Sequence, residues 1–160
     1  MIRVQREDFD IGAEIARLTA GNYRIGGIAS FIGTVREGAS HDGSTSLIGA
    51  ITLEHYSGMT ERQLEAIEAE ARARWTLDAC LIIHRYGRLE PGEQIVLVVT
   101  ASSHRQAALE SCAFLIDWLK TKAPFWKLEE TEAGARWVEA RASDDQTAER
   151  WTPTSPKAAE

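Results

Sequence analysis

Cysteine and histidine are scarce in this sequence of 160 residues. The two cysteines, Cys80 and Cys112, lie in apolar segments and form no C-x-x-C pair. The four histidines are spread over separate stretches, without an H-x-x-x-H pair. Disulfide frameworks and zinc sites both need sets of such residues at suitable spacing. The sequence therefore predicts two buried free thiols, no metal site and no bound cofactor.

Three further patterns are missing, and each excludes a class of protein. No apolar run approaches the roughly 20 residues that cross a bilayer, and the first residues lack the apolar core of a signal peptide, so the expected location is the cytoplasm. No G-x-S-x-G motif marks the nucleophile of a serine hydrolase. A net charge of −6 and a pI near 5.3 do not suit a nucleic-acid-binding protein, which is typically basic over a whole face.

The composition that remains is that of a globular domain, with 44% hydrophobic and 26% charged residues. Strand-like and helix-like segments are mixed, with hairpin turn residues at 89–92 and no regular strand–helix–strand repeat. We therefore predict an α+β fold with a mixed antiparallel sheet and three main helices. Residues 1–151 are expected to form one domain, and residues 152–160, with two prolines and little apolar content, a disordered tail.

Local patterns place the strands and the first helix. The expected strands are residues 2–4, 25–35, 47–55, 79–84, 94–100, 125–130 and 136–140. Asp8 or Asp10 is expected to cap a short helix that ends at Gly21. The segment 94–100 shows no alternation of polar and apolar residues, so it should be a central strand that is covered on both faces. The pair Gly26-Gly27 is expected to allow a bulge or a close backbone approach.

Capping motifs and a proline place the two longer helices. Thr60 with Gln63, and Ser103 with Gln106, have the form of capping boxes at two helix starts. Pro124 lacks an amide hydrogen and disfavours the α conformation of the residue before it. The third helix is therefore expected to begin at His104 and to end near residues 120–122.

The segment 104–127 is positively charged on an acidic chain. Four lysines and arginines against two acids give it a local balance of +2, so the remaining residues carry −8. This contrast indicates a local anion site, in which arginine holds phosphate or carboxylate and a desolvated lysine acts as nucleophile or acid/base. Lys120 and Lys122 also suit a purely structural role, because cations stabilise the negative end of a helix dipole.

Five motifs carry a resemblance to a known family. They are Phe31-Ile-Gly-Thr-Val-Arg36, Leu53-Glu-His-Tyr-Ser-Gly-Met59, His84-Arg-Tyr-Gly-Arg-Leu-Glu-Pro-Gly-Glu93, Ser103-His-Arg105 and Leu119-Lys-Thr-Lys-Ala-Pro-Phe-Trp-Lys127. From about residue 25 to Trp151 the series resembles the large, catalytic subunit of molybdopterin synthase. Several separated motifs at compatible spacing are far more specific than any one of them.

The resemblance implies a sulfurtransferase of molybdenum cofactor biosynthesis with an α/β-hammerhead fold. Members of the family convert cyclic pyranopterin monophosphate (precursor Z) into molybdopterin by installing two dithiolene sulfurs. The sulfur arrives as a thiocarboxylate on the C-terminal glycine of a small ubiquitin-like partner, which agrees with structural roles for Cys80 and Cys112. The large subunit forms a homodimer, and one small subunit at each outer end completes a heterotetramer.

Carried over residue by residue, the resemblance also implies a site. Lys120 is the leading candidate for proton transfer or covalent participation, and Lys127 is expected to assist it and to hold anionic substrate. The remaining substrate-binding positions that it implies are Thr34, Val35, Arg36, His104, Arg105, Glu129 and Arg141. In Lys127-Leu128-Glu129, leucine replaces the cation that is usual in the family, so no cationic side chain acts at position 128.

The helical rise puts Arg105 about 22 Å from Lys120, too far for both to touch one small substrate from a straight helix. This separation favours a pocket that is shared between subunits. Two other functions remain open. A non-catalytic module that binds the tail of a ubiquitin-like protein would not need both Lys120 and Lys127, and an unrelated pterin- or nucleotide-phosphate enzyme would not need a protein partner.

Overall fold

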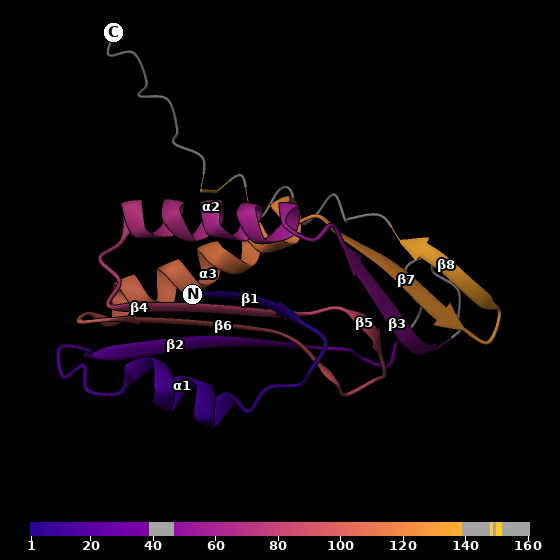
Figure 1. The fold of residues 1–160 in the computed structure, drawn as a ribbon, viewed down its shortest axis with the longest axis horizontal. Coiled ribbons are helices and arrows are strands. Elements are labelled where there is room, and N and C mark those ends of the chain that lie inside the picture. The colour runs from indigo at the N-terminus through magenta and orange to yellow at the C-terminus, as the bar shows by residue number, and fades with distance from the viewer. Residues whose placement is uncertain (39–46, 139–147, 149, 152–160) are drawn as a thin grey trace, which may run out of the picture.

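Two four-stranded sheets and three helices make up the described part of a computed structural model, which covers residues 1–38, 47–138, 148, 150 and 151 (Figure 1). The elements in chain order are β1 (Ile2–Gln5), α1 (Ile11–Thr19), β2 (Gly27–Thr34), β3 (Ile48–His55), α2 (Met59–Arg74), β4 (Ala79–Arg85), β5 (Gly87–Leu89), β6 (Gln94–Ser102), α3 (Arg105–Lys122), β7 (Phe125–Thr131) and β8 (Gly134–Val138). The predicted α+β class with three helices is confirmed. The strands divide between two sheets.

The first sheet has the strand order β1-β4-β6-β2, in which β1 runs parallel to β4 and the other pairs are antiparallel. Helices α2 and α3 cover one face, and α1 covers the other (Figure 1). Along β6, Val96 and Val98 pack towards α2 and α3, whereas Leu97 and Val99 pack towards α1. The prediction that residues 94–100 form a central strand buried on both faces is confirmed.

The second sheet has the order β5-β3-β7-β8 and is antiparallel throughout. It lies at one end of the first sheet, where α3 ends (Figure 1). As predicted, α3 stops at Lys122, and Ala123 donates its N–H to Leu119 O at 3.2 Å as the C-cap. Pro124 then leads directly into β7. The end of α3 and the start of β7 are therefore held together.

Both predicted capping boxes are wrong. His104, not Ser103, is the N-cap of α3, and Gln106 Nε2 donates to Glu110 instead of to the cap. Ser103 is part of the connection from β6, where Ser102 Oγ accepts the N–H of His104 at 3.4 Å.

At α2 the cap is Gly58, which has a φ of 80°. Glu61, the residue directly after Thr60, accepts the N–H of Gly58 at 2.6 Å. A positive φ at this helix start is easily reached only by glycine, and the cap lies two residues before the predicted Thr60.

Two local predictions near the N-terminus are confirmed. Asp10 caps α1, and its Oδ1 accepts the N–H of Ala13 at 2.8 Å. A Cβ atom at Gly26 would lie 2.3 Å from the main-chain oxygen of Ser103, so this glycine permits the close backbone approach that was expected. The next residue, Gly27 at the start of β2, lies against the backbone of Arg105 at the start of α3.

Some predictions fall outside the described residues, namely the disordered tail at 152–160 and the site residue Arg141. The division into a domain at 1–151 and a tail remains a prediction. None of the described helices is long and apolar enough to cross a membrane.

Candidate active site

A cavity of about 590 Å³ lies where the end of α3 and the start of β7 face the end of β2. Its lining residues are Phe31, Ile32, Gly33, Thr34, Val35, Arg36, Ile48, Ile51, His84, Ile95, Val96, Leu119, Lys120, Lys127 and Glu129. Six of the predicted site residues are in this set. The fold therefore brings together residues from three of the five sequence motifs that are distant along the chain, together with Glu129, and the size is typical of a small-molecule site.

Lys127 and Glu129 form an ion pair in the cavity wall. Because side chains alternate along β7, residues two apart point to the same face. Lys127 Nζ lies 2.9 Å from Glu129 Oε1, with the side chains 29% and 1% exposed. The buried carboxylate thus holds the lysine ammonium at a fixed place while part of that side chain stays accessible from the cavity.

Lys120 reaches the same cavity from the last turn of α3. Its side chain is exposed, and no carboxylate of the described residues pairs with it. Lys122, two residues later in the same turn, does not line the cavity. Both lysines complement the helix dipole, but only Lys120 is placed to meet a ligand here.

The segment Thr34–Arg36 forms the opposite rim. The register of β2 against β6 shifts after Gly33, so Thr34 pairs with Gln94. Val35 is buried and exchanges two backbone hydrogen bonds with the turn before β6. Its N–H donates to Glu93 O at 2.9 Å, and its carbonyl accepts from Gly92 at 2.7 Å. This fixed backbone carries the exposed side chains of Thr34 and Arg36 at the cavity mouth.

His84 is a cavity residue that the sequence analysis did not nominate. It is 5% exposed and stacks on Phe125, with ring centroids 3.7 Å apart and planes at 16°. Its Nδ1 lies 2.8 Å from the carbonyl of Arg85, which assigns the hydrogen to Nδ1. Burial lowers the pKa of His84 to about 4, so the ring is neutral at pH 7. Its position at the start of a family motif was the available clue.

His104 and Arg105 lie elsewhere in the subunit. They line a separate cavity of about 380 Å³ at the start of α3, together with Gly26, Ser103 and Gln106. Lys120 lies about 22 Å further along the helix by its rise. Within one subunit the structure therefore does not bring His104 and Arg105 to the lysines, and Arg141 lies outside the described residues.

The two cysteines are buried free thiols, as predicted. Burial raises the pKa of Cys80 to about 12 and that of Cys112 to about 11. Because the thiolate is the reactive form, neither residue is suited to carry sulfur. Neither cysteine lines the cavity, whose polar side chains include three cations, one carboxylate and one neutral imidazole.

Comparison with known proteins adds three findings. Residues 4–122 match the family described as MoaE protein. Proteins named molybdopterin synthase catalytic subunit from Ralstonia nicotianae and Pseudomonas aeruginosa are 54% and 53% identical over 150 residues, covering 94% of this chain and 83% and 97% of those proteins. A solved structure described as a molybdopterin biosynthesis MoaE protein from Burkholderia ambifaria has a TM-score of 0.80 at 51% identity, covering 96% of this chain and 99% of that one.

Proposed function

This chain belongs to the MoaE protein family, and we propose that it is the catalytic subunit of a molybdopterin synthase. In this role it converts precursor Z to molybdopterin with sulfur from the C-terminal thiocarboxylate of a small ubiquitin-like subunit. The observation that carries the proposal is the cavity in which Arg36, Lys120 and Lys127 converge. A module that only held a protein tail would not need these three cations around one small-molecule space. The cytoplasmic location stays a prediction.

The positions of the side chains suggest a division of roles. Arg36 at the rim and Lys127 in the wall are placed to bind the anionic groups of the substrate. Glu129 holds the ammonium of Lys127. Lys120 has no carboxylate partner in the described structure, so it is the residue we assign to proton transfer or to a covalent step. Sulfur comes from the partner, since both thiols of this chain are buried.

We also propose that two copies of the chain share each site. In the described structure β2 has a neighbouring strand, β6, on one side only. Exposed backbone edges favour pairing with another strand, and β2 also exposes Ile28. Its two ends lie beside the two separate cavities, with Gly27 next to Arg105 and Thr34 at the lysine cavity.

An antiparallel pairing of two β2 strands about their centre would exchange these ends. Gly27 of one copy would then lie opposite Thr34 of the other. This places His104 and Arg105 of one subunit beside Lys120 and Lys127 of its partner, which resolves the separation of about 22 Å within one chain. It also gives the homodimer at the centre of the heterotetramer a function in catalysis.

Mixing two inactive variants tests the shared site. Arg105→Ala removes a side chain at the start of α3, and Lys127→Ala removes one near the start of β7. If sites are shared, a mixed dimer has one site with both defects and one intact site, so random mixing should restore about one quarter of native activity. Mixtures that stay as inactive as either variant alone would contradict the proposal.

Single-turnover conversion of precursor Z with a thiocarboxylated small subunit tests the function. We expect product from the native chain, loss of product in Lys120→Ala, and little change in Lys122→Ala, which removes a cation of the same helical turn outside the cavity. Partner binding should persist in both variants. A folded, partner-bound native chain that forms no product would leave only the role of a binding module.

A further inference from the structure

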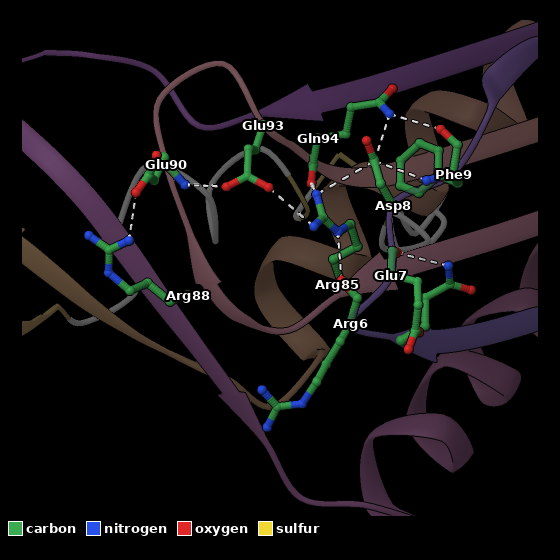
Figure 2. Close-up of polar contacts among 10 residues, drawn as sticks. Arg6, Glu7, Asp8, Phe9, Arg85, Arg88, Glu90, Glu93 and Gln94 are labelled. Carbon is green, nitrogen blue, oxygen red and sulfur yellow. Dashed lines mark hydrogen bonds and ion pairs between the residues drawn. The ribbon is translucent and has the colours of Figure 1, made fainter.

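Arg85, at the end of β4, has a buried guanidinium outside the cavity. Figure 2 shows its contacts with two other segments of the chain, residues 6–8 and residues 93–94. Nε donates to Arg6 O at 3.0 Å, Nη1 donates to Gln94 O at 2.9 Å, and Nη2 donates to Glu93 Oε1 at 3.2 Å. Asp8 Oδ1 lies 3.5 Å from Nη1. The side chain is only 8% exposed, so these groups replace its hydration.

The same contacts fix the turn that precedes β6. Glu93 uses one carboxylate oxygen for Arg85, and the other accepts the N–H of Glu90 at 2.7 Å (Figure 2). Its N–H donates to Glu90 O at 3.0 Å, which closes the turn. Gln94 also donates to Asp8 Oδ1 at 2.8 Å and to Phe9 O at 2.9 Å. The turn is thus tied to the connection between β1 and α1.

The same turn also holds the rim of the cavity. Val35 exchanges its two backbone hydrogen bonds with Gly92 and Glu93, the two residues at the end of the turn. Val35 lies between Thr34 and Arg36, which both line the cavity. A chain of direct contacts therefore runs from the Arg85 guanidinium through Glu93 to the backbone that carries Arg36.

Arg85 also acts on the cavity through its main chain. Its carbonyl accepts the Nδ1–H of His84 at 2.8 Å, and His84 lines the cavity floor against Phe125. One residue thereby fixes groups on two walls without touching the space between them.

We infer that Arg85 is a positioning residue for substrate binding, which sets the place of Arg36 through the turn at residues 90–93. The inference rests on the proposed function, since it takes the cavity as the substrate site. Loss of the guanidinium should let the turn and Val35 move, and Arg36 with them. Small displacements of a substrate-binding group are enough to cost roughly 10- to 100-fold in reaction efficiency.

Steady-state kinetics with precursor Z and saturating thiocarboxylated partner test this role. For Arg85→Gln we expect a KM raised about tenfold with kcat within about twofold, because substrate binding is weakened while Lys120 and Lys127 stay in place. Arg85→Lys should recover part of the loss. The matched control is Arg88→Gln, which removes an exposed guanidinium that pairs with Glu90 in the same turn and should change neither constant by more than about twofold.

Hydrogen exchange at the Val35 amide gives a readout independent of sulfur transfer. Arg85→Gln should lower its protection while the amide of Ile82 in the core stays protected. If Arg85→Gln does not fold, the same two measurements are made on Glu93→Gln, which weakens the same contact without removing a buried guanidinium. Unchanged KM and unchanged Val35 protection in the folded variant would overturn the inference. An inactive native chain whose Val35 protection still depends on Arg85 would instead refute the proposed function and leave a structural role only.

Discussion

Replacing Lys127 with methionine tests how strongly the ion pair in the cavity wall is coupled. Removing one partner of a fully buried pair costs about 3–5 kcal/mol, whereas an exposed pair contributes about 0–1 kcal/mol. Here Glu129 is 1% exposed and Lys127 is 29% exposed. Glu129 also takes part in a further interaction, so this residue keeps a partner when Lys127 is replaced. We therefore expect Lys127→Met to lower the free energy of unfolding by about 2 kcal/mol, or roughly 4–8 °C in Tm.

A double-mutant cycle with Glu129→Gln separates the pair from other effects of each substitution. Urea unfolding of the native chain, both single variants and the double variant gives the coupling energy, which we expect to be about 1 kcal/mol or more. The matched control cycle is Arg88→Met with Glu90→Gln, an exposed pair with side chains 53% and 62% accessible, for which about 0.5 kcal/mol or less is expected. Additivity at Lys127 and Glu129 within about 0.5 kcal/mol would refute the reasoning.

Three other predictions concern a close backbone contact, a buried histidine and the two buried cysteines. Gly26→Ala should lower the free energy of unfolding by about 1–3 kcal/mol in thermal unfolding, because the new Cβ would lie 2.3 Å from Ser103 O, and an unchanged Tm would contradict this. The pKa of His84 is lowered from 6.5 to about 4, so between these pH values the unfolded state binds a proton that the folded state excludes. Stability should therefore fall as pH drops from about 6.5 towards 4, by up to about 3 kcal/mol, and His84→Phe should flatten this part of the urea-unfolding profile. Cys80 and Cys112 should resist iodoacetamide in the folded chain at pH 8, measured by mass spectrometry, and their double replacement with alanine should leave single-turnover sulfur transfer intact.

The sequence predicted the elements of the fold better than their division into sheets. A run of apolar residues without alternation indicated that β6 is a central strand, because strands covered on both faces have that composition. The short strand β5 was missed. Only Tyr86 separates it from β4, and Gly87, with a φ of 92°, turns the chain into the second sheet. A change of direction at one glycine leaves too little trace in periodicity to predict a second sheet.

The caps of α2 and α3 were predicted wrongly for a different reason. Several polar residues near each start compete to cap the helix, and tertiary contacts decide among them. At α3 the strand β6 continues to Ser102, and Gly26 packs on the carbonyl of Ser103, so the helix begins after His104. Contacts between residues about 75 positions apart cannot be read from a four-residue motif.

The candidate site, too, was predictable only in part. The period of two along a strand makes the pairing of Lys127 with Glu129 predictable once β7 is predicted. The contributions of His84 and Arg85 were not predictable, because they depend on a packed ring and on three segments that meet only in the fold. Sequence motifs mark both residues without distinguishing a cavity floor from a buried anchor.

Charge balance connects this site to two anions. Arg36, Lys120 and Lys127 against Glu129 give the cavity a formal charge of +2 on a chain of −6. At physiological ionic strength the Debye length is about 8 Å, so acids elsewhere on the surface are screened and the near cations decide the local potential. On the proposed function the site must hold a cyclic phosphate diester and a thiocarboxylate, each with one negative charge. One cation fewer would leave these anions to repel each other, and without Glu129 the excess charge would favour retention of the carboxylate that remains on the partner's tail after sulfur transfer. The buried glutamate thus fits a site that has to release its protein partner twice for each product.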